Sequence, residues 1–155
     1  MTYRKASHAV YDCRYHIVWI TKYRRKCLIE PIQESLHKII EWVCKELYIT
    51  PIAIGMEEDH VHVYLSIPPV HPIPYVLQLL KWRSSHAIFR QEKFKAHLKK
   101  FYWWETKSLW AVGYFCATVW VVDEKIIQAY VEQQWKEDVE GVEIELIKKA
   151  KATGF

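Results

Sequence analysis

The sequence predicts an α+β fold of the ferredoxin-like (RRM-like) type, an antiparallel sheet with helices on one face plus a C-terminal helix. The first observation is the order of segments, which reads β-α-β-β-α-β followed by further helical pattern. The second is size, since 155 residues predict one compact domain over 1–155. The third is composition: 51% hydrophobic and 26% charged residues, with only 4 glycines, exclude a disordered or collagenous chain.

The first half of the chain supplies three strands and one helix. Residues 14–20 are β-branched and aromatic, which is typical of a strand. From Pro31 the apolar residues recur at helical spacing, and proline suits the first turn of a helix. Residues 49–56 and 60–67 are expected to be the next two strands, joined by an acidic hairpin connection and ended by Pro68-Pro69.

The second half begins with a long helix from Ile73 to about Gln91. A basic and aromatic stretch follows over residues 93–104, and the β-rich run 109–121 predicts the last strand. Asp123 is expected to cap a C-terminal helix that Gly141 breaks, and a short helix closes the chain.

The sequence lacks the signals of export and of membrane insertion. No apolar segment follows Met1 as in a secretory leader, and no apolar run approaches the roughly 18 residues of a membrane span. The four cysteines show no CxxC spacing, which fits neither a zinc ribbon nor a disulfide framework. We therefore expect reduced thiols, a cytoplasmic location and no membrane partner.

The most informative segment is the strand that starts with His60-Val61-His62. Alternate side chains of a strand share a face, so His60 and His62 lie on the face opposite the valines, with Cα atoms about 6–7 Å apart. Both imidazoles could therefore reach one divalent metal, and the acidic residues 57–59 could add ligands or support them. The alternative is a pair of ordinary surface histidines on a half-exposed strand.

A second pair lies on the C-terminal helix. Tyr130 and Gln134 are four residues apart and so share one helix face, beside an apolar stripe that can pack the helix down. Each residue alone has an ordinary explanation, as a packed tyrosine and a solvated glutamine. The combination of this pair with the histidine strand and the basic aromatic stretch is what favours a catalytic site.

In this order the motifs resemble the TnpA-type HUH transposases with a single catalytic tyrosine, which small bacterial and archaeal insertion sequences encode, and their REP-associated tyrosine transposase relatives. The matching segments cover most of residues 14 to 136 and are 15–19 with 21–25, 59–62, 79–85, 109–115 and 126–134. One departure is Trp120, which stands where the family usually has glycine before the tyrosine helix.

The resemblance implies a single HUH transposase domain that cuts and rejoins single-stranded DNA through a 5′-phosphotyrosine intermediate at insertion-sequence ends that carry hairpins. It makes Tyr130 the catalytic nucleophile on a C-terminal catalytic helix, and His60, His62 and Gln134 the ligands of Mg²⁺ or Mn²⁺. Glu57 or Asp59 could approach the metal as well. It also implies a homodimer, and it leaves open whether the tyrosine helix completes the active site of its own protomer or that of its partner.

A DNA-binding surface is expected from two groups of basic residues that can neutralise phosphates. The first group is Lys22, Arg24, Arg25 and Lys26, and the second is Lys81, Arg83, Arg90, Lys93, Lys95, Lys99 and Lys100. The aromatic residues of 94–104 either stack on unpaired bases or fill the core, and we expect a mixture in which Trp103 or Trp104 is buried.

Two other function classes fit the same fold. A non-catalytic module that binds single-stranded nucleic acid would use stacked aromatics as an RRM does, although the glycine-rich strand of that class is missing. A domesticated relative would still nick DNA but serve the host. A metal hydrolase of small phosphoesters is a weaker third, because it would not need the basic aromatic segment.

Overall fold

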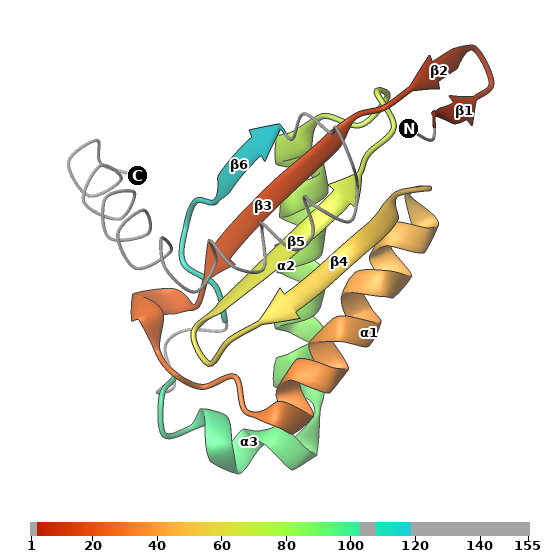
Figure 1. Ribbon diagram of the computed structural model, residues 1–155. Helices are drawn as coiled ribbons and strands as arrows, with labels where there is room; N and C mark the ends of the chain where they lie inside the picture. The colour runs from red at the N-terminus through yellow and green to blue at the C-terminus, as the bar shows by residue number, and fades with distance from the viewer. Residues whose placement is uncertain (1–2, 103–107, 119–155) are drawn as a thin grey trace.

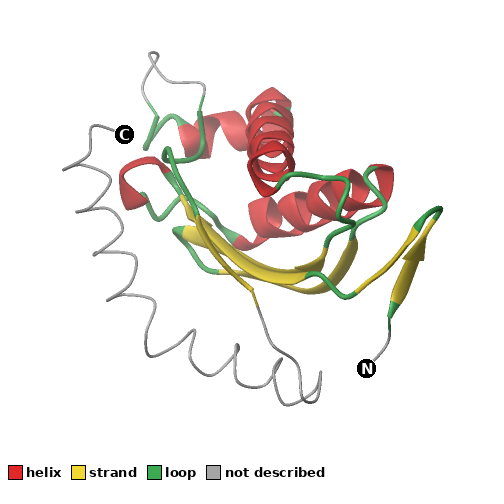
Figure 2. Ribbon diagram, turned by 90° about the horizontal axis from the view of Figure 1, so that it is seen from above, coloured by secondary structure: helices red, strands yellow, loops and turns green. Residues whose placement is uncertain are grey.

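The sheet and its helices form two layers in the computed structural model, which describes residues 3–102 and 108–118 (Figures 1 and 2). Four antiparallel strands stand in the order β4-β5-β3-β6. Their bounds are β3 Arg14–Ile20, β4 Thr50–Met56, β5 His60–Ser66 and β6 Phe115–Thr118. This order and the helices on one face confirm the ferredoxin-like class, while the expected C-terminal helix lies outside the described residues.

Three helices cover one face of this sheet (Figure 2). They are α1 Glu30–Glu46, α2 Ile73–Arg90 and α3 Glu92–Leu98, and a short 3-10 turn, η1 Lys22–Arg24, follows β3. Pro31 stands in the first turn of α1, where its missing N–H would have no helical partner. The buried residues of α1 recur every three or four positions, as expected, because only one side of the helix meets the sheet.

The core lies between the helices and one face of β3 and β5. Val61, Val63 and Leu65 of β5 are buried, and the first two stand opposite Trp19 and Ile17 of β3. All five side chains belong to the hydrophobic cluster that the helices complete. The strand alternation expected for residues 60–67 is therefore confirmed on this face.

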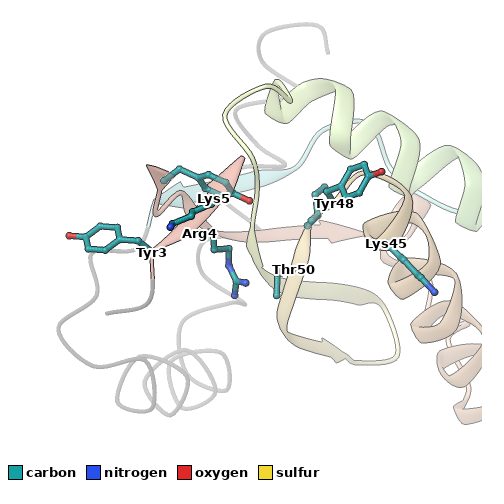
Figure 3. Close-up of a pocket in the computed structure, with 8 residues that line it drawn as sticks. Tyr3, Arg4, Lys5, Lys45, Tyr48 and Thr50 are labelled. Atoms are coloured by element: carbon teal, nitrogen blue, oxygen red, sulfur yellow. The ribbon is translucent and has the colours of Figure 1, made fainter. Parts of the chain in front are cut away.

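The N-terminal residues form a hairpin that the sequence did not predict. Strands β1 Arg4–Ala6 and β2 Ala9–Tyr11 pair with each other in a separate two-stranded sheet. The hairpin projects beyond the start of β3, and a hollow opens between it and the C-terminal end of α1 (Figure 3). At the edge of the main sheet, β4 carries an irregular register between Pro51 and Ala53.

The predicted strand over 109–121 is wrong in its first part. Within the described residues only Phe115–Thr118 form a strand, and Trp110 makes a single bridge to Thr21. Gly113 adopts a φ of 96°, a left-handed conformation that interrupts an extended run. Residues 119–121 of the expected strand lie outside the described part of the chain.

Hydrogen bonds to α2 explain the path of residues 109–113. The Lys81 Nζ donates to the carbonyl oxygens of Ala111 and Gly113 at 2.7 and 2.8 Å. The Leu109 N–H donates to Ser85 Oγ at 2.9 Å, and the Trp110 indole N–H donates to Ser84 Oγ at 2.9 Å. Side chains of α2 therefore bind backbone groups of residues 109–113 that a neighbouring strand would bind in a regular sheet. These bonds also fix the path of the chain into β6.

No helix among the described residues has the length and apolar character that crossing a membrane requires. All four cysteines, Cys13, Cys27, Cys44 and Cys116, are free thiols.

We expect Ser84→Ala to destabilise the fold by about 1–3 kcal/mol, because the buried Trp110 indole N–H loses its acceptor. Urea denaturation measures this change in the free energy of unfolding. The matched control is the same substitution in a Trp110→Phe background, where no indole N–H remains to be satisfied and the loss should be clearly smaller. Equal losses in the two backgrounds would contradict this role of Ser84.

Candidate functional site

Three imidazoles lie near one another on β5 and β3. The ring centroids of His60 and His62 are 6.4 Å apart, and the ring centroid of His16 on β3 also lies 6.4 Å from that of His62, in an edge-on arrangement. His60 is only 7% exposed, which argues against an ordinary surface histidine. The next side chains on this face, Tyr64 and Ser66, are also buried, so β5 is enclosed on both faces.

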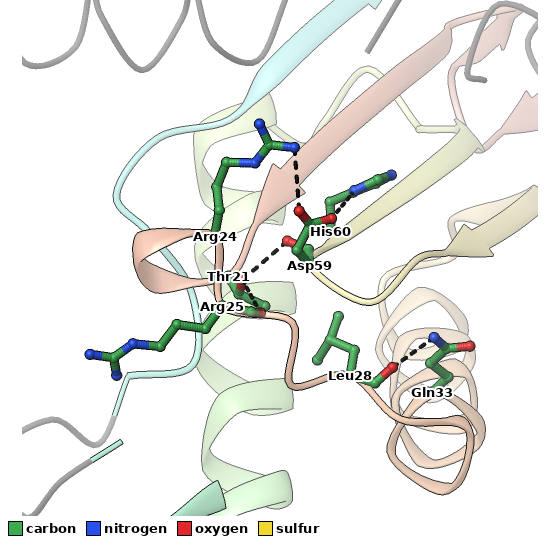
Figure 4. A network of polar contacts seen from close by, with 7 residues as sticks. All are labelled: Thr21, Arg24, Arg25, Leu28, Gln33, Asp59 and His60. Carbon is green, nitrogen blue, oxygen red and sulfur yellow. Dashed lines mark hydrogen bonds and ion pairs between the residues drawn. The ribbon is translucent and has the colours of Figure 1, made fainter. Parts of the chain in front are cut away.

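His60 is held by the carboxylate that precedes it. Asp59 Oδ1 lies 2.6 Å from His60 Nδ1, and Asp59 Oδ2 accepts from the Arg24 guanidinium at 3.3 Å (Figure 4). An ionised carboxylate can only accept, so Nδ1 carries the proton and Nε2 holds the lone pair. Burial lowers the pKa of His60, while the hydrogen bond and charge of Asp59 oppose that lowering.

The position of Asp59 is itself fixed by Thr21 at the end of β3. The Asp59 carbonyl accepts from the Thr21 N–H at 2.9 Å and from the Thr21 hydroxyl at 3.2 Å (Figure 4). The single hydrogen of this hydroxyl is shared with the Arg25 carbonyl oxygen, which lies closer, at 2.8 Å from Thr21 Oγ1. Thr21 is completely buried, so the turn before β5 and the basic turn after β3 form one rigid corner.

His62 depends on a glycine in the neighbouring strand. Gly55 of β4 stands directly opposite His62, and a Cβ atom at Gly55 would lie 1.9 Å from His62 Nε2. Only glycine leaves room for the imidazole to lie across the strand at this point. Burial, reinforced by the neighbouring imidazoles of His16 and His60, lowers the pKa of His62 to about 3.

Two neutral imidazoles, one of them oriented by a carboxylate, are a donor set that suits a divalent metal. Among the described residues no group of three His, Cys, Asp or Glu side chains could complete such a site. The third expected ligand, Gln134, and the expected nucleophile, Tyr130, lie outside the described residues. Both oxygens of the Asp59 carboxylate already contact side chains, His60 and Arg24, so Asp59 orients the His60 imidazole instead of offering a free ligand oxygen. Glu57 lies in the exposed turn before β5.

The first group of basic residues expected to bind DNA lies beside the α3 part of the second group, while Lys81, Arg83 and Arg90 of the second group lie on α2. The Arg25 guanidinium lies 4.9 Å from the ring centroid of Tyr102, which follows α3, and 5.0 Å from that of Tyr23. His97 of α3 contacts the Cys27 carbonyl with its Nε2 at 2.8 Å. We call this region the η1–α3 surface, defined by Lys22, Arg24, Arg25, Lys26, Lys93, Lys95, Lys99 and Lys100.

Several of the expected phosphate-binding cations already have partners inside the protein. Lys81 donates to two carbonyls, and its burial lowers the pKa of the ammonium to about 8. Arg83 pairs with Glu46 and lies over the ring of Trp42. In the η1–α3 surface, Lys95 pairs with Glu92, and Arg24 pairs with Asp59.

The expected aromatic platforms are mostly part of the core. Phe94 and Tyr102 are buried, Phe101 is half-buried, and Trp103 and Trp104 lie outside the described residues. Tyr23, which sequence reasoning did not single out, is 73% exposed between Lys22 and Arg25. Its place within a run of cations was the available signal, because an exposed aromatic among phosphate-binding side chains can stack on a base.

Sequence reasoning also missed His16, Thr21 and Gly55. His16 could have been found from the alternation of the first strand, and Gly55 from its place inside a strand, where glycine often marks a close approach. Thr21 gave no signal of this kind, because its hydrogen bonds reach residues that only the tertiary fold brings near.

Residues 9–134 match the family model described as "Transposase IS200 like". The chain is 28% identical over 146 residues to the transposase for insertion sequence element IS200 of Salmonella typhimurium, covering 92% of this chain and 90% of that protein. It is 30% identical over 131 residues to the ISDra2 transposase TnpA of Deinococcus radiodurans, covering 84% and 90% of the two chains.

Two solved structures are also similar. A crystal structure described as a transposase from Deinococcus radiodurans aligns with a TM-score of 0.65 and 30% identity, covering 84% of this chain and 97% of that chain. A REP-associated tyrosine transposase bound to a REP hairpin aligns with a TM-score of 0.57 over 90% of this chain and 74% of that chain. The second likeness has 13% identity and shows the fold alone.

Gly55→Ala should displace the His62 imidazole and destabilise the protein by about 1–3 kcal/mol, because the new methyl group overlaps the ring. Histidine ring NMR resonances report the displacement, and urea denaturation reports the free energy of unfolding. In a His62→Ala background the same substitution meets no ring and should cost little. Unchanged His62 resonances in the Gly55→Ala protein would show that the ring does not depend on this space.

The stability of the protein should rise with pH between about 3 and 6.5 through His62. In this window an unfolded histidine binds a proton and the folded His62, with its pKa lowered to about 3, does not. The contribution is therefore complete above pH 6.5 and is lost as the pH falls, with a slope of up to about 1.4 kcal/mol per pH unit. Urea denaturation at pH 5 and pH 7 should show a smaller difference for His62→Gln than for the wild type, and equal differences would argue against a neutral, half-buried His62.

Proposed function

Since this chain belongs to the IS200-like transposase family, we propose that it cuts and rejoins single-stranded DNA at insertion-sequence ends through a 5′-phosphotyrosine intermediate. The observation that carries the proposal is the oriented histidine pair on β5, with Asp59 fixing His60 and Gly55 making room for His62. The matched residues 9–134 include this pair and also Tyr130 and Gln134.

Tyr130 is the proposed nucleophile. Its phenol oxygen forms a bond to phosphorus, the bond from phosphorus to the 3′ oxygen breaks, and the proton lost by the phenol is balanced by the one gained at the 3′-OH. The covalent link keeps the energy of the phosphodiester, so a later attack by a 3′-OH rejoins the strands without a nucleotide cofactor. With an ordinary pKa near 10, a tyrosine is a suitable partner for reversible exchange with an alcohol.

His60, His62 and Gln134 are the proposed ligands of Mg²⁺ or Mn²⁺. A divalent ion held by these residues would supply Lewis-acid polarisation of the phosphate and help to orient the scissile bond. The hydrogen bond to Asp59 keeps the proton of His60 on Nδ1, so the lone pair of the other ring nitrogen, Nε2, is the one that can bind a metal. Because burial lowers the pKa of both imidazoles, they are neutral at physiological pH and need release no proton to act as ligands.

The η1–α3 surface is the proposed place of DNA binding, with Tyr23 exposed for base stacking and Lys22 and Arg25 beside it. The recognised DNA is proposed to be a hairpin near the element end. We also propose a homodimer in which the tyrosine helix of one protomer completes the active site of the other.

Trp120 keeps two alternatives to an active transposase open. It stands where the family usually has glycine, just before the segment that carries Tyr130. A chain that had become a non-catalytic single-strand binder, or a domesticated host nickase, would keep the fold and the basic surface. The binder would retain DNA when Tyr130 is replaced and when metal is chelated.

We expect wild-type protein, incubated with labelled single-stranded DNA from an element end and Mg²⁺ or Mn²⁺, to give a covalent protein–DNA band on a denaturing gel. Tyr130→Phe and EDTA should each abolish the band, because one removes the nucleophile and the other the metal. The matched control is Tyr75→Phe, which removes an exposed hydroxyl on α2 and should leave the band unchanged.

A band of wild-type strength in the Tyr130→Phe protein would place the nucleophile elsewhere, and Tyr64 and Tyr114 would be examined next. Hairpin binding with no band in the wild type would favour the non-catalytic binder.

A further inference from the structure

A basic and aromatic hollow of about 510 Å³ lies at the end of the sheet where the β1–β2 hairpin approaches α1 (Figure 3). Its polar lining consists of three cations and three tyrosines together with Thr50, and no carboxylate lines it. The cations are Arg4 and Lys5 of β1 and Lys45 of α1. Within the part of the chain that the structure describes, none of the three forms an ion pair.

Tyr48 is the unusual member of the lining. It follows the end of α1 with a φ of 56°, a left-handed conformation that glycine adopts easily and that is strained for a tyrosine. Its ring is also 83% exposed, so the strain is not repaid by burial in the core. The conformation belongs to the C-terminal cap of α1, where the Tyr48 N–H donates to the Lys45 carbonyl at 3.3 Å and the Ile49 N–H donates to the Cys44 carbonyl at 2.9 Å. The cap presents an exposed aromatic ring at the rim of a basic hollow, where it can contact a ligand.

We propose that this hollow is a second binding site for single-stranded DNA, in which a base stacks on Tyr48 and the neighbouring phosphates lie against Arg4, Lys5 and Lys45. Lysine and arginine side chains neutralise phosphates, and tyrosine faces stack on bases only when those bases are unpaired. The hollow has the volume of an ordinary small-ligand pocket, which is enough for a base and its phosphate. That the ligand is DNA rests on the proposed function.

The hollow is distinct from the histidine site. Thr50, which lines it, begins β4, and Gly55 near the other end of β4 faces His62. Five residues of a strand span about 17 Å, so the two sites lie near opposite ends of the sheet. The hollow would therefore hold DNA that flanks the reacting phosphate, and would add affinity without taking part in the chemistry.

Tyr48→Gly separates a ligand-binding role from a structural one. Glycine relieves the left-handed strain, so the melting temperature should stay the same or rise by a few degrees. The affinity for a 20-nucleotide oligothymidylate without hairpins, measured by fluorescence anisotropy on the full chain, should fall about tenfold because a stacking face is lost. Tyr75→Gly would break α2, so the aromatic control is Tyr75→Ala, which should leave the affinity unchanged.

A second experiment tests the three basic residues through the salt dependence of oligothymidylate binding. Each phosphate contact on a single strand contributes about 0.7 to the slope of log affinity against log salt, so the triple variant Arg4→Gln, Lys5→Gln, Lys45→Gln should lower the slope by about 2. Taken singly, Lys45→Gln should lower the slope more than Lys38→Gln, which removes an exposed cation of the same helix outside the hollow.

The outcomes separate this inference from the proposed strand transfer. If the wild type forms no covalent band but Tyr48→Gly weakens oligothymidylate binding, the proposal of a DNA-binding hollow is supported and the proposal of strand transfer is contradicted. If the band forms and none of the hollow variants changes affinity or salt slope, the hollow proposal is overturned. It is also overturned if the Tyr48-dependent binding prefers oligouridylate, or if the variants alter self-association in sedimentation and leave DNA affinity unchanged.

Discussion

The register between β3 and β5 is the constraint on which the rest of the structure depends. It places Ile17 opposite Val63, and this pair lies in the core. The same register places His62 opposite Val18 and His60 opposite Ile20, on the other face of the strand. Because side chains alternate, a slip of one residue would send the imidazoles into the apolar core. The apolar residues that fold the sheet therefore also fix the position of the histidines.

The corner at Asp59 and Thr21 converts this strand geometry into a site. Asp59 uses its carbonyl to hold the end of β3 and its carboxylate to hold both His60 and Arg24. A single turn residue thus ties the histidine to the basic η1 segment. The proposed metal ligand His60 and the proposed DNA-binding surface can keep a fixed relation only when the groups between them are rigid, and Thr21 and Asp59 are both buried.

Sequence reasoning succeeded where periodicity is strong. The recurrence of apolar residues from Pro31 placed the start of α1 to within one residue, and the alternation around His60 and His62 predicted their shared face. It failed at residues 109–113, because their β-rich composition is overridden by hydrogen bonds to Lys81, Ser84 and Ser85, which only the tertiary fold brings near. It missed the close packing of His62 on Gly55 for the same reason, since the contact joins two strands. The roles of Tyr130 and Gln134 remain predictions.

The irregular register of β4 has a consequence for the protein in solution. Among the described strands, β4 forms one edge of the main sheet, and an edge strand is a template onto which another chain can add. Pro51 has no amide hydrogen to offer, and the shift between Pro51 and Ala53 bends the strand where an incoming strand would have to match it. Both features make this edge a poor template for a second strand, which is the way in which natural sheets limit edge-to-edge aggregation.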